Sequence, residues 1–344
     1  MAAVQIDPTR APVAFGRWAL PRLARELRDP DPVTRRRALA TLCDLVREPE
    51  RAYEAVRGGC MEQLKLLLRD EDLTVRRKTT ELIHLLTAHS VGRQALLCAG
   101  ALSPLSELLY ESDAPCRLNV HRALNRLTLL PAGVEALLPL VPRLLLLLQE
   151  EEENEEEERV LLLSTLGRCV RLDAASALLC RGVSVLTRQL SHSSAAVRRE
   201  AAEALNAASV SAQGKREVCE GAVLPVLVEL LSDGDIDVQA NAAAAIMNTA
   251  VITAGKRRCL ELGVLPLLLA LLSEEEEDEG RRKRRKALLV YSLRALSCLA
   301  EHPAGRRLLL QQLPLLSRRG GEEEEEPEIR RAAQTAIQVV TWKP

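Results

Sequence analysis

The chain has 344 residues, 47% of them hydrophobic and 2% aromatic, and a formal net charge of −1. No run of uncharged apolar residues reaches the roughly 18 that a membrane-spanning helix needs, so we expect no membrane segment. The first residues, MAAVQIDPTRAP, lack the apolar core of a secretion signal. Nine cysteines without C-x-x-C spacing indicate a reducing intracellular compartment.

The small net charge conceals a segregation of charge along the chain. Three runs at residues 150–158, 274–279 and 322–326 hold 8, 6 and 5 acidic residues. All 47 Lys and Arg residues lie outside these runs, together with the other 29 acidic residues. Either the acidic loops fold back over a basic body, or the body meets an acidic partner.

Residues 1–18 are expected to form an extended N-terminal arm, because Pro8 and Pro12 exclude a long helix. Phe15 and Trp18 supply two of the six aromatic rings of the chain. These rings either cap the open end of the first repeat, as a repeat stack needs, or contact a partner protein. Both residues are therefore candidate partner-binding residues.

Residues 19–344 carry a repeated three-helix pattern, which is clearest at Val223–Gly263. This copy predicts an apolar helix at Val223–Leu231 and an Asp-rich turn at Ser232–Asp237. A helix with small residues on one face follows at Val238–Val251, and a short amphipathic helix at Gly255–Leu262. Neither long helix can bury its apolar stripe alone, so the pattern predicts a stack of such units.

The copies follow one another through the chain. The residue ahead of each small-residue helix aligns at Thr34, Val75, Cys116, Glu158, Val197, Val238, Arg285 and Ile329. Successive positions are 39 to 47 residues apart, within the range of HEAT and armadillo units. We predict an all-α fold, an armadillo/HEAT-like right-handed α-solenoid of about eight repeats of ~41 residues, forming a single domain over 19–344.

Each predicted turn contains Asp or Glu, which favour a helix start through capping and the helix dipole. A basic or polar residue then stands in the first turn of the small-residue helix, where the dipole disfavours a cation. We expect these side chains to pair with neighbouring acids or to lay their stems against the next repeat. Four of them are also candidate partner-binding residues: Arg76, Arg117, Arg198 and Gln239.

Three repeats depart from the pattern. The turn of the fourth is the acidic run 150–158, which we expect to be solvated. In the seventh, EEEEDEG and RRKRRK are inserted ahead of a helix. The basic segment Arg281–Lys286 is either a nuclear-localisation or nucleic-acid patch or a self-neutralising loop; the acids before it and the lack of aromatic residues favour the loop. In the last repeat, Arg318–Pro327 is expected to replace most of the second helix.

The sequence offers no site for catalysis. The five histidines have no pair at ligand spacing on one helical face. Motifs for metalloproteases, serine hydrolases, phosphate loops and dinucleotide binding are missing from the sequence. We expect no enzyme, no cofactor, no metal site and no small-molecule substrate. Cys98, Cys180, Cys219 and Cys259 recur just before the glycine that ends a unit, which indicates packing positions.

Armadillo proteins that bind nuclear-localisation peptides carry a ladder of Trp and, four residues later, Asn on the groove helices. Here Asn248 takes an Asn position, but Ala244 stands where Trp is needed. Asn125 and Asn206 fall one place early in their units. The ladder is absent, so an importin-type receptor is not expected. Asn248 remains a candidate partner-binding residue.

Two stretches, IDPTRAPVAFGRW in the arm and REPERAYEAVRGGC after the first repeat, are not general armadillo features. With the rest of Ile6–His89 they resemble the radial spoke head fourteen homologues, the armadillo-repeat proteins of vertebrate ciliary radial spokes. The resemblance implies a non-enzymatic structural subunit of the ciliary or flagellar axoneme that supports motility, located in cytoplasm and cytoskeleton.

Its implied partners are other radial spoke proteins, contacted along the concave groove and by the N-terminal arm, with no nucleic acid and no membrane. The alternative is a soluble armadillo-type peptide-binding adaptor in transport or signalling.

Overall fold

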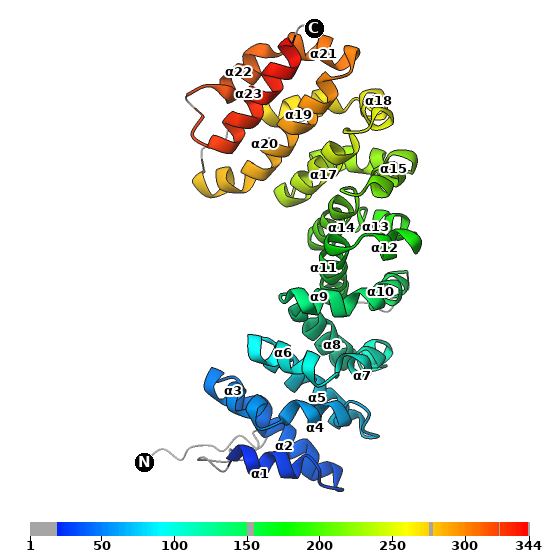
Figure 1. Cartoon of the computed structure of the whole chain (residues 1–344), viewed down its shortest axis with the longest axis vertical. Coiled ribbons are helices and arrows are strands. Elements are labelled where there is room, and N and C mark those ends of the chain that lie inside the picture. Colours follow the sequence, from blue (N-terminus) through cyan, green and yellow to red (C-terminus); the bar gives the residue numbers. More distant parts are fainter. Residues whose placement is uncertain (1–18, 150–154, 275–277, 323, 343–344) are drawn as a thin grey trace. The chain divides into compact units, whose positions relative to one another are not determined.

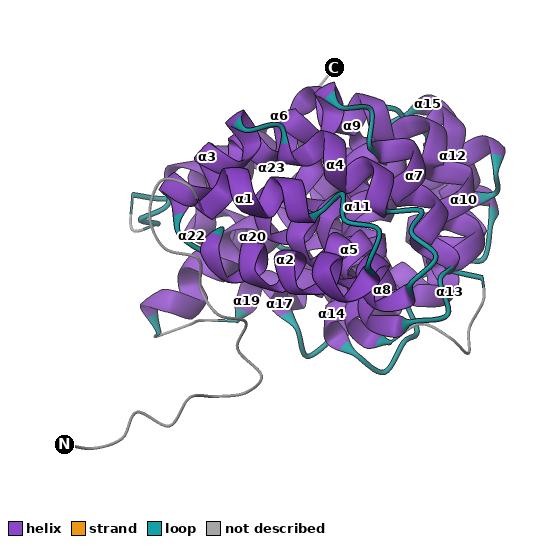
Figure 2. Cartoon of the chain, turned by 90° about the horizontal axis from the view of Figure 1, so that it is seen from below, coloured by secondary structure: helices purple, strands orange, loops and turns teal. Residues whose placement is uncertain are grey.

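The computed structural model describes residues 19–149, 155–274, 278–322 and 324–342. Over these residues the chain forms α-helices and short 3-10 helices joined by loops, and no strand (Figure 2). Contacts between helices divide the chain into two compact units, residues 1–137 and 138–344. The single domain over 19–344 stays a prediction.

The N-terminal unit holds three repeats, each with an apolar helix, a small-residue helix and a short helix (Figure 1). The helices are α1 (Ala19–Glu26), α2 (Pro32–Leu45), α3 (Pro49–Arg57), α4 (Cys60–Leu67), α5 (Leu73–Thr87), α6 (Ser90–Cys98), α7 (Leu102–Glu107), η1 (Leu108–Tyr110), α8 (Ala114–Leu127) and α9 (Pro131–Leu137).

The C-terminal unit holds five more repeats, the last without a short helix. Its helices are η2 (Leu138–Leu140), α10 (Val141–Leu147), α11 (Glu156–Leu172), α12 (Ala175–Leu179), α13 (Gly182–Gln189), α14 (Ala195–Ala208), α15 (Ala212–Glu220), α16 (Val223–Glu229), η3 (Leu230–Ser232), α17 (Ile236–Thr249), α18 (Thr253–Glu261), α19 (Val264–Ser273), α20 (Glu279–Ala300), α21 (Pro303–Leu310), α22 (Leu313–Gly320) and α23 (Pro327–Thr341).

The copy at Val223–Gly263 folds as predicted, with boundaries shifted by a few residues. Its apolar helix ends in a 3-10 turn, and Gly263 closes the unit with a φ of 69°, a left-handed conformation that suits glycine. Asp235 starts α17 by accepting hydrogen bonds from the N–H groups of Asp237 and Val238. Asp31, Asp72 and Asp113 cap α2, α5 and α8 in the same way, which confirms the predicted role of the acidic turns.

The small-residue helices pack side by side, α2, α5 and α8 in one unit and α11, α14, α17, α20 and α23 in the other. On α17, Ala242, Ala243, Ala245 and Ile246 are fully buried, and Ala244 is nearly so. Small side chains let the helix axes approach closely, so the aromatic-poor core of Leu, Ala and Val is filled by helix-on-helix packing.

A glycine marks the corner between most small-residue helices and the short helices that follow. Among the described residues, five of the seven short helices have glycine as their third residue: Gly92, Gly133, Gly214, Gly255 and Gly305. A Cβ atom at these positions would lie 2.0–2.2 Å from the carbonyl oxygen six residues earlier, at the end of the preceding helix. Only a residue without a side chain permits this approach, because real Cβ contacts are never that short.

Three expectations about irregular parts need correction. The last repeat keeps a full second helix, because α23 runs for 15 residues from Pro327 and buries one face against α20 and α22. Glu155 to Glu157 are exposed, but Glu158 is 1% exposed, so the end of the first acidic run is not solvated. Residues 150–154 lie outside the described residues. Cys219 and Cys259 are buried packing residues, whereas Cys98 is exposed.

Candidate interaction surfaces

The first-turn arginines of the small-residue helices connect adjacent repeats. Arg198 donates to the carbonyl oxygens of His192 and Ser193, both at 2.8 Å, and so binds the turn that precedes its own helix. The same guanidinium donates to both carboxylate oxygens of Asp233, at 2.7 and 3.0 Å, in the turn of the next repeat. Each such arginine, with its two carbonyls and its acid, is called a repeat clamp below.

The repeat clamp recurs in the N-terminal unit. Arg76 donates to the carbonyl oxygens of Asp70 and Glu71 and pairs with Glu111 at 2.7 Å. Arg35 binds its own turn and pairs with Asp70 at 2.9 Å. In all three clamps the acid lies 35 residues after the arginine. The predicted pairing of these arginines with neighbouring acids is confirmed.

Arg117 and Gln239 also bind the turn that precedes their own helices. Arg117 donates to the carbonyl oxygens of Glu111 and Ser112, and the Gln239 amide donates to the carbonyl oxygen of Asp233 at 2.8 Å. The structure therefore gives Arg76, Arg117, Arg198 and Gln239 contacts within the chain. Their partner-binding role stays a prediction.

Asn248 also bonds within the chain. Its Nδ2 donates to Oδ1 of Asn206 and to Oγ of Ser209, each at 3.1 Å, and so joins α17 to the end of α14. An Asn that clamps a peptide backbone needs its amide donors for the peptide. Here they serve inter-repeat packing, and the role of Asn248 in partner binding stays a prediction.

The arm residues Phe15 and Trp18 lie outside the described residues, and their role stays a prediction. The first described helix, α1, contributes to a depression shared with α2, α3 and α4. Its floor is apolar, with Leu20, Ala24 and Leu42 among the lining residues.

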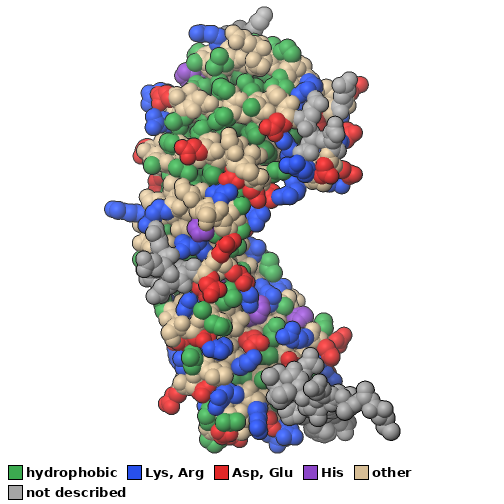
Figure 3. Space-filling view, turned by 180° about the vertical axis from the view of Figure 1, so that it is seen from behind, with side chains coloured by type: hydrophobic (Ala, Val, Ile, Leu, Met, Phe, Trp, Pro, Cys, Tyr) green, Lys and Arg blue, Asp and Glu red, His purple; other side chains and the backbone are tan. Residues whose placement is uncertain are grey.

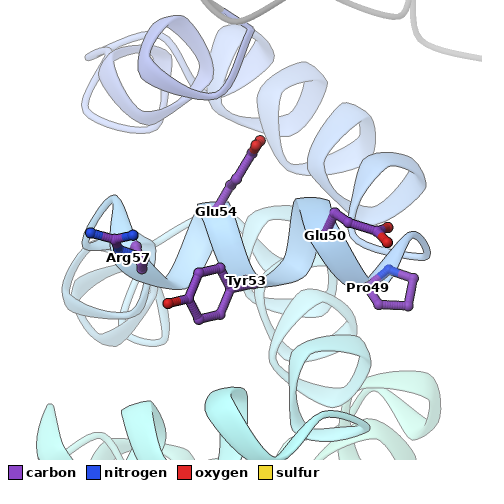
Figure 4. A pocket seen from close by; sticks show the side chains of 5 residues that line it. All are labelled: Pro49, Glu50, Tyr53, Glu54 and Arg57. Carbon is purple, nitrogen blue, oxygen red and sulfur yellow. The ribbon is translucent and has the colours of Figure 1, made fainter.

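A shallow depression lies on α3 (Figure 4). All of its lining side chains come from this one helix: Pro49, Glu50, Tyr53, Glu54 and Arg57. Tyr53 is 49% exposed, and the Arg57 guanidinium carbon lies 5.7 Å from the ring centroid, a cation–π distance. Because a single helix supplies every lining residue, the depression is an open surface that does not enclose a small molecule.

The basic segment Arg281–Lys286 forms the first turns of α20 and is helical, not the predicted loop. The interpretation as self-neutralising is confirmed, because the side chains from Arg282 to Lys286 each pair with an acid. Two of the acids in these pairs, Glu325 and Glu326, belong to the third acidic run, 2.9 Å from Arg282 and 3.1 Å from Lys286. Glu274, from the second run, pairs with Arg285 at 2.5 Å.

Three arginines and a histidine meet where α5 ends, and His84, Arg93, Arg122 and Arg126 are called the basic cluster below. Arg126, on α8, donates from Nη1 to the carbonyl oxygen of His84 at 2.6 Å. Arg93, on α6, donates to the carbonyl oxygens of Thr87 and Ala88 at 2.9 and 3.0 Å. All four side chains are half-buried. Figure 3 shows basic and histidine side chains together on the surface of this unit.

The cluster is electrostatically crowded. Burial, followed by the charges of Arg126 and Arg122, lowers the pKa of His84 to about 4, so this imidazole is neutral at pH 7. Burial and the charges of Arg122 and Arg93 lower the pKa of Arg126. The sequence reasoning missed this cluster, because its members come from three helices up to 42 residues apart. One signal was available: a basic residue also follows the corner glycine at Lys215, Lys256 and Arg306.

In the part of the chain that the structure describes, no three His, Cys, Asp or Glu side chains gather as a metal site. No helix there is both long and apolar enough to cross a membrane.

Comparison with known proteins supports the fold. The Armadillo/beta-catenin-like repeat model matches residues 211–250, which include α15, α16 and α17. A crystal structure of an engineered protein is similar in fold, with a TM-score of 0.76 and 20% sequence identity, over 95% of this chain and 89% of that chain. The fold is therefore all-α and of the armadillo/HEAT-like solenoid class, as the repeat pattern predicts.

Proposed function

We propose that the chain is a non-enzymatic scaffold subunit of the axonemal radial spoke, holding other spoke proteins and supporting ciliary or flagellar motility. The observation that carries the proposal is the resemblance of Ile6–His89, including the arm and the segment that forms α3. The armadillo repeat at 211–250 supports the coarser part, a protein that binds other proteins.

The contacts within each unit fit a scaffold. Repeat clamps and buried alanine faces fix neighbouring helices, so the remaining side chains present a surface of defined shape. The alternative, a soluble armadillo-type peptide-binding adaptor in transport or signalling, lacks support at Asn248, whose amide bonds to Asn206 and Ser209.

The test is the fate of the tagged chain in ciliated cells. We expect it to stay with axonemes after detergent extraction and to co-purify with radial spokes. A chain found wholly in the detergent-soluble fraction, in cells whose spokes are intact, contradicts the proposal.

A second arm of this experiment uses a chain that lacks residues 1–18. If the arm holds spoke proteins, the shortened chain enters spokes poorly while its melting temperature stays close to that of the full chain. If the shortened chain enters spokes at the normal level, the arm is not needed to hold spoke proteins, and the scaffold proposal is unaffected.

A further inference from the structure

Arg93 and Arg126 of the basic cluster differ from two other half-buried arginines of the N-terminal unit, Arg35 and Arg76. Arg35 and Arg76 each pair with an acid within 3.0 Å. Among the described residues, Arg93 and Arg126 bond to carbonyl oxygens and to no carboxylate. The negative end of the α5 dipole and these carbonyls explain why cations gather here. They do not neutralise the guanidinium charges of Arg93 and Arg126.

The unused donors make the cluster a recognition surface. A guanidinium has five N–H donors, and Arg126 uses one of them within the described chain. Nε of Arg93 is buried without a hydrogen-bond partner. A carboxylate placed between Arg93 and Arg126 would accept from both side chains, because planar guanidinium groups match carboxylate oxygens in paired bonds.

We propose that the basic cluster is the docking site for an acidic segment of a partner protein, with an Asp or Glu carboxylate accepting hydrogen bonds from Arg93 and Arg126. The inference deepens the proposed function and rests on it in one respect, that the partners of this chain are proteins.

The structure favours a protein carboxylate over a nucleic acid. Non-specific nucleic-acid grooves combine basic side chains with aromatic rings on which bases stack. The helices that build the cluster, α5, α6 and α8, contain no Phe, Tyr or Trp. The cluster is also a single compact group at the end of α5, whereas a protein that follows a phosphate backbone presents an extended row of cations.

The experiment measures binding of a rhodamine-labelled oligoglutamate peptide to the full chain by fluorescence anisotropy, with oligoglutamine as the neutral control. We expect binding to oligoglutamate that weakens as salt is added. Arg126→Gln retains a donor for the His84 carbonyl but removes the charge, and we expect it to weaken binding about tenfold. Arg93→Gln is an independent second variant with the same expectation.

Arg25→Gln is the matched control, because Arg25 is an exposed arginine of α1 in the same unit and its loss changes the net charge equally. We expect it to bind like the unchanged chain. Equal affinities for all three variants overturn the inference, since the peptide would then respond to net charge alone. Tighter binding of a single-stranded DNA oligonucleotide, lost in Arg126→Gln, would overturn it in favour of nucleic acid.

This test separates the inference from the proposed function. If the chain binds oligoglutamate through Arg126 but does not enter axonemes, the docking site is supported and the radial spoke role is refuted. If the chain enters axonemes but all variants bind oligoglutamate equally, only the docking site is refuted.

Discussion

At the scale of single residues, the first-turn arginines bind both their own turn and the acid of the next repeat, although the helix dipole disfavours a cation at this position. Arg198 lies near the positive end of α14, yet its guanidinium extends to carbonyl oxygens of its own turn and to the Asp233 carboxylate. The clamp thus satisfies a charge that would otherwise be unfavourable there. Sequence reasoning anticipated the pairing but not its repeated 35-residue spacing.

Replacing the clamp acid gives a prediction about stability and pH. Burial raises the pKa of Asp233, but the hydrogen bonds from Arg198 and the Asp235 N–H outweigh it, so the pKa lies below the ordinary 3.8. Asp233→Asn is expected to lower the free energy of unfolding by about 2 kcal/mol at pH 7, because Arg198 then lacks its carboxylate.

The lowered pKa sets the pH window. A carboxyl group with a lowered folded-state pKa stabilises fully above its unfolded pKa and loses that effect as pH falls through the folded value. The stability difference between the unchanged chain and Asp233→Asn, measured by urea denaturation, is therefore expected to persist from pH 7 to pH 5 and to shrink below 3.8. If the difference in unfolding free energy does not change with pH, the ionised carboxylate of Asp233 is not what stabilises the clamp.

Ala243 tests the packing of the small-residue face. Ala243 is fully buried on α17. Ala243→Glu is expected to destabilise the chain by about 4 kcal/mol, because a carboxylate would be buried without a partner. Glu155→Gln, at an exposed position, is the control and should change stability by less than about 0.5 kcal/mol. Equal melting temperatures for both variants would mean that the buried face is wrongly assigned.

At the scale of elements, the corner glycines determine how each short helix leaves the small-residue helix. The Cβ site of Gly255 lies 2.0 Å from the Thr249 carbonyl oxygen, and Gly92 has the same separation from Leu86. The two helices therefore touch backbone to backbone, and a side chain of any size would push them apart.

Gly255→Ala is expected to cost about 3 kcal/mol of stability, since the added methyl group forces the backbone of α17 and α18 to shift. Gly234→Ala is the matched control, because nothing lies within 4 Å of its Cβ site. Thermal unfolding of the two variants checks the expectation. A loss for Gly234→Ala as large as that for Gly255→Ala would show that the cost comes from glycine replacement in general.

The elements were predictable where one signal repeats within a helix. The spacing of apolar residues predicted α16 and α17, and the acidic turns located the helix starts to within a few residues. The corner glycines were missed because each contributes one residue per repeat, without periodicity inside a helix. The burial of Glu158 and the assembly of the basic cluster depend on packing between helices distant in sequence, which no local pattern contains.

At the scale of the whole molecule, the acidic runs and the basic body are partly paired within the chain. Glu325 and Glu326 bind α20, and Glu274 binds Arg285, so these three acids pair within the C-terminal unit. Arg282 and Glu325 are both exposed, and such an exposed pair contributes little to stability. Among the described residues, Arg93 and Arg126 of the basic cluster bond to carbonyl oxygens and to no carboxylate, which is the physical ground for proposing that they bind a partner's acid.

Two compact units of stacked repeats predict local responses to mutation. Stability in repeat proteins is transmitted between neighbouring repeats, not through a global core. In hydrogen–deuterium exchange of the full chain, Gly255→Ala should raise exchange in α16 to α19, and Gly92→Ala in α4 to α8. Each should leave peptides of the other unit unchanged. A uniform rise across both units would refute this locality.

The constant distance between corner glycine and carbonyl also indicates where the chain accepts extra residues. The separation is six residues at each of the five corners, although the spacing of the aligned helix starts varies from 39 to 47. Length variation is therefore excluded from these corners, and extra residues occur instead at the acidic runs that lie at the starts of α11 and α20. Epitope tags or partner-binding peptides should be grafted into those runs, because a single residue added between Leu86 and Gly92 would put a side chain where the backbones meet.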